Sequence, residues 1–308
     1  MKKRFIVPFI VATIVFSIGY AVVGHKISRL EQLRRENNVF YKDRDLTKDG
    51  VDEEIEPLNN DELLFLLAGI DHSNLSDTLI LCKVNFKTGE IDLLSIPRDS
   101  RVYVNGALDK INHAHGKGGI ELTLKTIQDF LDLKVDYYVR ADFKAVKAIV
   151  DAIGGVKLDV KRDMHYKDTT KGKELFINIK KGEQVLDGDK ALEFLRFRRY
   201  RDGDVERVQA QQQFMEEFIK QTLQIKNITK WMDILETYYS YVDTNIPISE
   251  ITKGLKMALK WDKENIHVNT IPGVGRYIGD ISYYIVDEEG TRDMVLGIFK
   301  DYLFSELD

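Results

Sequence analysis

Continuous apolar runs separated by polar turns dominate the chain from residue 60 onward. Residues 63–68, 78–86 and 91–96 are such runs, and their length predicts buried central strands. The sequence Lys-Thr-Gly-Glu at residues 87–90 lies between the last two runs and predicts a hairpin turn. Further strands are predicted at residues 135–140, 156–160, 175–179, 266–271 and 282–286.

Amphipathic segments alternate with these strands. Their periodicity predicts helices at residues 120–131, 143–153, 189–196, 205–223, 228–241, 248–261 and from 288 onward. Gly154 and Gly155 follow the second helix, as glycine commonly does at a helix C-terminus. Strands mixed with helices on this scale predict an α/β fold, a three-layer sandwich with a central mixed β-sheet flanked by helices.

The N-terminus has a different pattern. Residues 2–4 are basic and residues 5–24 carry no charge. A helix of this length rises about 1.5 Å per residue and reaches roughly 30 Å, the thickness of the hydrocarbon core. A cleavable signal usually has a shorter apolar region. We therefore predict one N-terminal transmembrane helix at residues 5–24 that remains in the protein as a signal anchor.

The orientation of this anchor follows from its flanks. The basic tail, residues 1–4, favours a cytoplasmic N-terminus and a single-pass protein of the cell membrane with its domain outside. Basic residues also follow the span, so their count alone leaves the orientation open. Residues 25–60 are polar and charge-dense and are predicted to be an extracytoplasmic linker or stalk, and residues 61–308 the globular domain.

Charge and cysteine content narrow the function. The 308 residues carry a formal net charge of −5, which argues against a general nucleic-acid binder because such proteins need a broadly basic surface. Cys82 is the single cysteine, so no internal disulfide can form. It lies in an apolar run and is expected to be a small buried hydrophobic residue.

Positive charge is concentrated after residue 195, where five arginines fall between residues 196 and 207. A guanidinium presents a planar fork of donors that fits phosphate oxygens. Arg196 and Arg198 would point the same way in an extended chain. If a helix starts near Asp204, Arg207 and Gln211 share one face of it. The pattern indicates a phosphorylated ligand, and the alternative is a solvated face with weak ion pairs.

Acidic and basic residues also stand at the ends of the predicted central strands. Asp71 and Asp77 flank a short loop between two strands, which is suited to holding Mg²⁺ with a diphosphate completing its shell. The alternative is that each aspartate caps a turn. Pro97 closes the next strand and would aim Arg98 from its end. The alternative there is a surface pair of Arg98 with Asp99 or Asp77.

Several other sites are disfavoured. The histidines in residues 110–115 lack a third His or Cys at the spacing of a zinc site. Residues 116–119, Gly-Lys-Gly-Gly, do not have the spacing of an NTPase phosphate loop. No Gly-x-Ser-x-Gly element indicates a serine hydrolase.

The order of these motifs resembles the LytR-CpsA-Psr family of Gram-positive cell-envelope proteins. The resemblance covers roughly residues 62–223, with residues 224–308 completing the domain. No single motif is specific, but the ordered set is. The motifs are Gly-Ile-Asp at 69–71, Ser-Asp-Thr at 76–78, Ser-Ile-Pro-Arg-Asp at 95–99, Lys-Ile-Asn-His-Ala at 110–114, Gly-Gly-Val at 154–156, Leu-Asp-Gly at 186–188, Arg-Phe-Arg at 196–198, and Asp-Val-Glu-Arg at 204–207 followed by Gln211.

The resemblance implies a phosphotransferase that moves an anionic glycopolymer, of the wall teichoic acid or capsular polysaccharide type, from a polyprenyl diphosphate carrier to peptidoglycan. It implies a Mg²⁺ ion, or Mn²⁺ in its place, that bridges the diphosphate, and an apolar tunnel for the prenyl tail. By motif, the metal ligands are Asp71 and Asp77, and the diphosphate ligands are Arg98, Arg196, Arg198, Arg207 and Gln211. Arg98 would also be catalytic, and Asp99 or Asp204 would accept the proton of the acceptor hydroxyl.

The chain departs from the family pattern at two places. The loop between Asp71 and Asp77 is short and lacks the basic residue often found before Ser76, and Ala210 stands where a second arginine is common. Two alternative functions therefore stay open. They are a non-catalytic envelope regulator that binds lipid diphosphates or glycans, and a hydrolase of the same carrier-linked glycan.

Overall fold

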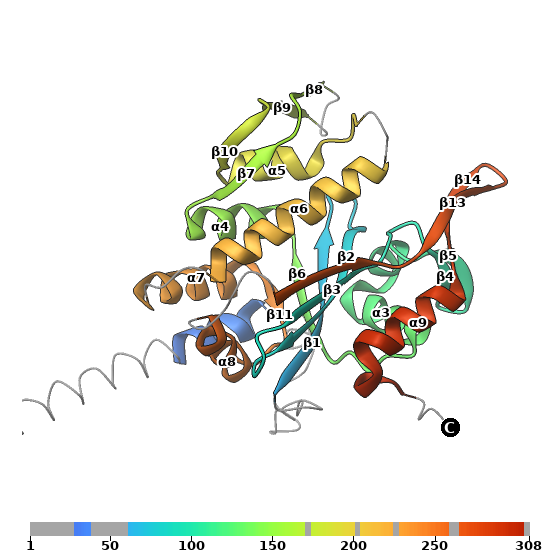
Figure 1. Ribbon diagram of the computed structural model, residues 1–308, viewed down its shortest axis with the longest axis horizontal. Helices are drawn as coiled ribbons and strands as arrows, with labels where there is room; N and C mark the ends of the chain where they lie inside the picture. Colours follow the sequence, from blue (N-terminus) through green and yellow to red (C-terminus); the bar gives the residue numbers. More distant parts are fainter. Residues whose placement is uncertain are drawn as a thin grey trace, which may run out of the picture.

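The computed structural model describes residues 28–37, 61–169, 174–200, 204–223, 228–258 and 265–304. Its centre is a six-stranded sheet with the order β11-β6-β1-β2-β3-β12 (Figure 1). The predicted tail at residues 1–4 and anchor at residues 5–24 lie outside the described residues. None of the helices in the described ranges is long and apolar enough to cross a membrane.

The sheet is mixed, as predicted. Strand β1 (Glu62–Ile70) pairs antiparallel with β2 (Ser76–Asn85) and parallel with β6 (Tyr137–Ala141). The turn at residues 87–90 leads from β2 into the antiparallel strand β3 (Ile91–Ser95). The edges of the sheet are formed by β12 (Ile266–Thr270), parallel to β3, and β11 (Asp243–Thr244), antiparallel to β6.

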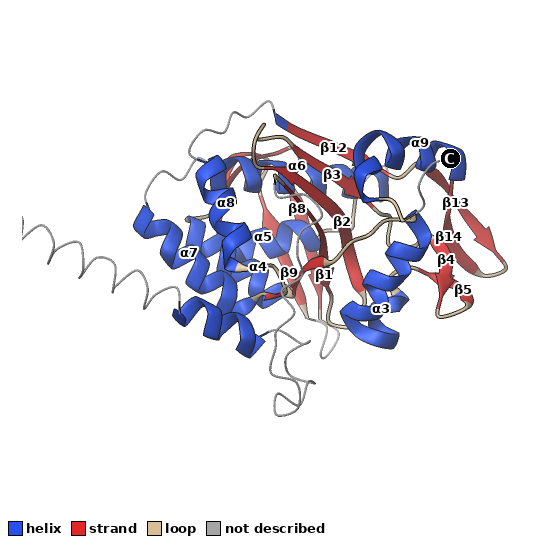
Figure 2. Ribbon diagram, turned by 90° about the horizontal axis from the view of Figure 1, so that it is seen from below, coloured by secondary structure: helices blue, strands red, loops and turns tan. Residues whose placement is uncertain are grey.

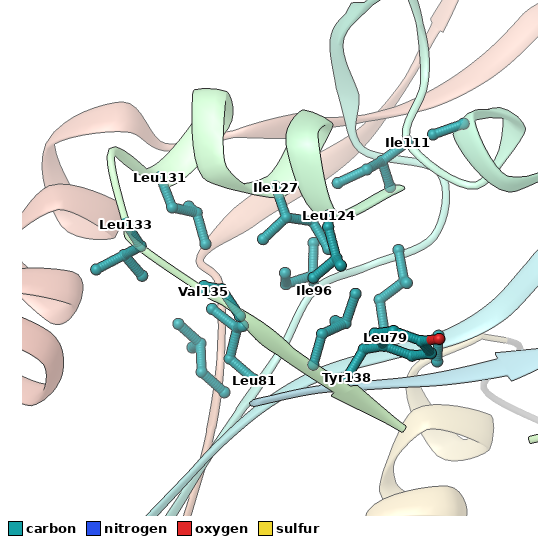
Figure 3. Packing of buried hydrophobic residues seen from close by; sticks show 14 of the residues in the cluster. Leu79, Leu81, Ile96, Ile111, Leu124, Ile127, Leu131, Leu133, Val135 and Tyr138 are labelled. Carbon is teal, nitrogen blue, oxygen red and sulfur yellow. The ribbon is translucent and has the colours of Figure 1, made fainter. Parts of the chain in front are cut away.

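Helices cover both faces of the sheet (Figure 2). On one face, α3 (His113–Leu131) and α9 (Glu288–Phe299) enclose the largest apolar core, followed by the short helix η2 (Lys300–Tyr302). Figure 3 shows Leu124 and Ile127 of α3 facing Leu79, Leu81 and Tyr138 of the strands. These side chains are at most 7% exposed, so the periodicity in the sequence marks this interface correctly.

The other face carries α4 (Phe143–Ile153), α6 (Asp204–Leu223), α7 (Ile228–Tyr241) and α8 (Ile248–Ala258). The helix predicted at residues 248–261 continues into residues outside the described part of the chain. Residues 28–37, within the predicted stalk, form a helix that packs on this layer. Leu30 of that helix is buried against Leu235, Tyr239 and Ile248.

A second core lies between α4, α5 (Gly188–Arg196), α6 and two small sheets. One sheet pairs β7 (Val156–Val160) with β10 (Gly182–Leu186), and the other pairs β8 (Met164–Asp168) with β9 (Leu175–Ile179). The sequence analysis predicted β7 and β9 and missed β8 and β10. Exposed and polar positions interrupt the apolar pattern in both missed strands.

Two further hairpins extend from the side of α3 and α9 (Figure 1). They are β4 (Arg101–Val104) with β5 (Ala107–Lys110), and β13 (Gly273–Ile278) with β14 (Ile281–Val286). Only β14 was predicted. Helix α3 starts before the predicted residue 120, with non-helical backbone at Gly118 and Gly119. Gly154 has φ 96° and caps α4, as expected, and Cys82 is buried in the sheet.

Candidate functional site

A β-bulge positions Asp77. In the register of β1 and β2, Gly69 faces Thr78 and Ile70 faces Ser76, so Asp77 is the extra residue on β2. A bulge turns a side chain away from the regular alternation of a strand. Gly69 permits the close approach, since a Cβ added there would lie 3.1 Å from Thr78 Cβ. The local geometry therefore presents the Asp77 carboxylate at the end of the central strands.

Arg98 is held by a tight turn after β3. Ser100 N donates to the Pro97 carbonyl at 2.9 Å, and Asn112 N donates to the Arg98 carbonyl at 3.1 Å. The Asn112 carbonyl in turn accepts from Ser76 N at 3.4 Å, on the residue before Asp77. Backbone hydrogen bonds thus fix Arg98 and Asp77 relative to each other.

Asp77 joins two of the predicted arginines. Its Oδ1 accepts a hydrogen bond from Arg98 Nη1, and its Oδ2 lies 3.4 Å from Arg198 Nη2. The side chains of Asp77 and Arg98 are about one quarter exposed, whereas Arg198 is 59% exposed. Charge-assisted pairs in such a half-buried position are stronger than pairs on an open surface. The cluster combines two guanidinium groups with one carboxylate.

Arg196 completes this cluster. It is the last residue of α5, and its guanidinium carbon lies 5.0 Å from the centre of the Phe143 ring. Burial lowers the pKa of Arg196, the neighbouring charge of Arg198 lowers it further, and Asp77 opposes both. The charges of Arg196 and Arg198 therefore oppose each other, and the Asp77 carboxylate acts on both. Such a site favours an additional anion.

Asp99 forms the edge of the cluster next to Arg98. Its Oδ1 lies 2.8 Å from Lys110 Nζ, and its Oδ2 lies 3.7 Å from Arg98 Nε. Lys110 ends β5, a strand that the sequence analysis did not predict. Asp99 is consequently oriented by cations from two different segments.

The remaining predicted ligands lie on α6. Arg207 and Gln211 are one turn apart on this helix, as the sequence predicted. Gln211 Nε2 donates to the Leu195 carbonyl at 3.4 Å, next to Arg196. The charge of Arg207 acts on Tyr200, whose pKa is raised to about 12 by burial first and by Glu206 second. Asp204 is the first residue of α6, and its side chain lies outside the described part of the structure.

Asp71 lies in the loop between β1 and β2. Its Oδ1 accepts hydrogen bonds from Ser73 N at 2.8 Å and Leu75 N at 3.0 Å, which is the turn-capping role considered above. In the described part of the chain, its Oδ2 has no hydrogen-bond partner. Asp71 and Asp77 offer two carboxylates, and no group of three His, Cys, Asp or Glu that could hold a metal occurs among the described residues. This donor set fits Mg²⁺, which usually takes one or two carboxylates and completes its shell with phosphate and water.

A buried polar chain behind this loop was not predicted. His115 is 3% exposed, and its Nδ1 lies 2.9 Å from the Asn74 carbonyl in the loop. Its Nε2 accepts from Arg140 Nε at 3.0 Å. Arg140 pairs with Asp243, whose Oδ1 accepts from the Tyr138 hydroxyl at 2.9 Å. This series of hydrogen-bonded side chains supports Asn74, which has a left-handed φ of 61°. A lone histidine in the sequence carries no signal for such a partner set.

Comparison with known proteins decides the family. The model of the LytR_cpsA_psr family matches residues 30–296. The chain belongs to the LytR-CpsA-Psr family. It is 32% identical to the polyisoprenyl-teichoic acid--peptidoglycan teichoic acid transferase TagU of Halalkalibacterium halodurans, over 98% of this chain and 99% of that protein. It is 34% identical to TagU of Bacillus cereus over 82% of each chain. The predictions of this family and of a transferase are confirmed.

Solved structures of LytR-CpsA-Psr proteins share the fold. The crystal structure of B. subtilis TagV matches with a TM-score of 0.67 and 29% identity, over 78% of this chain and 97% of that one. TagT bound to LIIa-WTA matches with a TM-score of 0.64 and 26% identity, over 80% of this chain and 93% of that one. The central mixed sheet flanked by helices is confirmed.

The departures from the LytR-CpsA-Psr pattern have structural consequences. In the short loop after β1, Leu75 lies so close to α3 that a Cβ on Gly116 would be 3.1 Å from Leu75 Cδ2. The loop therefore packs closely against α3. Ala210 on α6 packs against the second core instead of contributing a charge.

Proposed function

We propose that the protein transfers a phosphate-linked anionic glycopolymer from a polyprenyl diphosphate carrier to a hydroxyl of peptidoglycan, with Mg²⁺ as cofactor. Its TagU relatives are named as transferases of teichoic acid from a polyisoprenyl-linked form to peptidoglycan, which supports this activity. The observation that carries the proposal is the group of three arginines, Arg98, Arg196 and Arg198, whose charges meet at Asp77 at the end of the central strands.

The arginines suit the chemistry. Phosphoryl transfer depends on positioning and on neutralising the charge that develops on phosphate oxygens, more than on covalent catalysis. The Asp77 carboxylate pairs with guanidinium groups that a diphosphate would also bind. Arg98, Arg196 and Arg198 would bind the diphosphate directly, while Arg207 and Gln211 on α6 would approach it from the side of α5.

Asp71 and Asp77 would hold the metal. Mg²⁺ bound there would neutralise negative charge on the diphosphate and orient its leaving oxygen. Asp77 would then exchange part of its pairing with Arg98 and Arg198 for the metal. Two backbone N–H groups hold Oδ1 of Asp71, which would leave its Oδ2 for the metal.

A carboxylate next to the arginines would accept the proton of the acceptor hydroxyl. Asp99 is the candidate whose side chain the structure describes, and Lys110 and Arg98 hold it at the edge of the cluster. Asp204 stays a candidate by motif alone. Proton transfer of this kind contributes roughly 10²–10⁴-fold to a rate.

The prenyl tail needs an apolar path. Phe65, Leu67 and Phe86 are only partly buried and belong, with Met215 of α6, to one apolar cluster on this face of the sheet. We assign the tail to this region between the sheet and α6. An anchor at residues 5–24 would keep the domain near its membrane-bound donor and raise the effective concentration of that donor.

The test is a transfer assay with the full-length protein in detergent. Protein, Mg²⁺, a polyprenyl-diphosphate-linked glycan and peptidoglycan oligomers are incubated together, and the phosphodiester product is sought by mass spectrometry. Product is expected with the unmodified protein and with Arg292→Ala, an exposed arginine on α9. It should be lost in Arg98→Ala and after chelation by EDTA, and be restored by added Mg²⁺.

The other outcomes identify the alternatives. Free glycan phosphate without attachment to peptidoglycan would show a hydrolase and reject the transferase. Bound but unreacted donor across a panel of glycans would show a non-catalytic binder. Full activity of Arg98→Ala would overturn the assignment of the site.

A further inference from the structure

Exposed apolar side chains gather on the two hairpins beside the arginine cluster. In β4–β5, Tyr103 is 67% exposed, and Leu108, which faces it across the hairpin, is 42% exposed. In β13–β14, the exposed apolar residues are Val274, Tyr277, Ile278 and Ile281. Apolar side chains concentrated in this way mark interaction sites on soluble domains.

The two hairpins form one surface. Arg101 and Tyr103 are two residues apart on β4 and therefore point to the same side. Arg101 and Lys110 lie over the ring of Tyr283 in β14, at 5.6 Å and 5.8 Å from its centre. Tyr283 faces Arg276 across the second hairpin. Tyrosine rings and positive charges thus alternate across both hairpins.

A short series of contacts joins this surface to the candidate site. Lys110 lies over Tyr283 and also pairs with Asp99, which is next to Arg98. Tyr284 N donates to the Asp99 carbonyl at 2.8 Å, so the β13–β14 hairpin is tied to the turn that carries Arg98. A molecule lying on the hairpins would reach the edge of the arginine cluster.

The surface is remote from the segment nearest the N-terminus that the structure describes. The helix at residues 28–37 packs beside α7 and α8, at the opposite end of the molecule from β13–β14 in Figure 1. Figure 2 shows the same separation of α7 and α8 from the two hairpins. The position favours a partner away from the membrane over the lipid surface.

We propose that the outer face of β4–β5 and the adjoining face of β13–β14 bind the acceptor, a peptidoglycan glycan strand, and deliver its hydroxyl to the arginine cluster. This inference rests on the proposed transfer to peptidoglycan. The chemistry of the two partners is complementary. The C–H groups of a sugar ring are weakly positive and pack on the negative face of a tyrosine ring. Carboxylates of the peptide stems would pair with Arg101 and Arg276.

Binding and transfer are measured separately on the full-length protein in detergent. Binding is measured by co-sedimentation with purified peptidoglycan sacculi that have been stripped of their glycopolymers. Transfer is measured as the initial rate at varied acceptor and donor concentrations. The variants are Tyr103→Ala and Arg276→Gln, with Tyr103→Trp as the conservative change. The matched control is Tyr241→Ala, because Tyr241 is an aromatic residue 54% exposed at the far end of the molecule on α7.

Tyr103→Ala and Arg276→Gln together should weaken sacculus binding and raise the acceptor KM roughly fivefold to tenfold. The donor KM and the kcat at saturating acceptor should change by less than about twofold. The thermal midpoint should be unchanged, because these side chains are exposed. Tyr103→Trp should retain binding, and Tyr241→Ala should behave as the unmodified protein. Unchanged sacculus binding in the double variant would overturn the proposal, as would an equal loss in Tyr241→Ala.

The design separates this surface from the proposed function. Sacculus binding that depends on Tyr103, without any transfer, would retain the surface and reject the transferase. Transfer with an unaltered acceptor KM in the double variant would reject the surface and retain the transferase. Loss of self-association in sedimentation velocity, with sacculus binding unchanged, would assign the face to a second copy of the chain.

Discussion

Asp77 shows how one extra residue in a strand changes the chemistry of a site. Without the bulge, regular alternation from Thr78 would turn its side chain to the other face of β2. With the bulge, its carboxylate reaches Arg98 and Arg198 at once. An ion pair of Arg98 with Asp77 and a role of Arg98 in ligand binding are therefore compatible, because a diphosphate would bind the same guanidinium groups that pair with Asp77.

Arg198 and its neighbour Arg199 offer a matched test of this site. Arg198 pairs with Asp77, whereas Arg199 lies over the ring of Tyr166, 4.9 Å from its centre. Arg198→Gln should raise the donor KM roughly tenfold to a hundredfold, since a charge-assisted contact to phosphate is worth about 1.5–3 kcal/mol. Arg199→Gln should change it by less than about twofold. Donor titrations at fixed acceptor measure both, and equal effects of the two substitutions would show that only the overall charge matters.

At the scale of elements, the site depends on how α5 packs against α4. Asp187 caps α5 by accepting from Lys190 N at 2.9 Å, and Gly188 N donates to Asp151 Oδ1 on α4 at 2.8 Å. A Cβ on Gly188 would lie 2.5 Å from the Lys147 carbonyl oxygen. Glycine is thus required for the two helices to approach, and the far end of α5 carries Arg196.

Gly188→Ala should destabilise the fold by about 2 kcal/mol, because the helices must separate to admit the methyl group. It should also lower donor affinity by displacing Arg196. Gly297→Ala is the control, since a Cβ there meets nothing within 4 Å on exposed α9. That change should stabilise the protein by up to about 1 kcal/mol, as alanine favours a helix over glycine. Urea unfolding followed by circular dichroism measures both, and equal midpoints would contradict the packing argument.

The elements themselves follow the sequence wherever one periodicity dominates. The buried strands β1, β2 and β3 are continuous apolar runs, and α4 has the predicted bounds Phe143–Ile153. Strands β4, β5, β8, β10 and β13 were missed because exposed positions interrupt their patterns. These strands pair within small hairpins and bury only part of their side chains.

At the scale of the whole molecule, the polar chain from Asn74 to Tyr138 connects the loop of the site to the sheet. His115 accepts from Arg140 only when its Nε2 is unprotonated. Burial lowers the pKa of His115, Arg140 lowers it further, and the Asn74 carbonyl, Asp243 and Asp71 oppose this. The folded protein therefore favours the neutral imidazole.

This arrangement gives a pH dependence with a definite sign. The unfolded chain binds a proton at His115 more readily than the folded one, so stability is complete above the usual histidine pKa of 6.5 and falls as the pH drops below it. His115→Gln keeps a hydrogen-bonding side chain without a proton to gain. It should lower stability at pH 7.5 and reduce the additional loss between pH 7 and 5. Thermal midpoints of both proteins between pH 7 and 5 measure this loss of stability. An unchanged dependence of the midpoint on pH in the variant would contradict the role of His115.

The two-residue edge strand β11 was missed. The sequence by itself determined the other five strands of the central sheet, the main helices and the family, and it indicated the candidate ligands. Each of these depends on local periodicity or on the order of short motifs along the chain. Only the tertiary structure decided that Asp77 bridges Arg98 and Arg198, that Lys110 orients Asp99, and that His115 supports the loop. A bulge, a hairpin and a buried hydrogen-bond chain join residues far apart in sequence. Their geometry comes from packing, which local patterns do not encode.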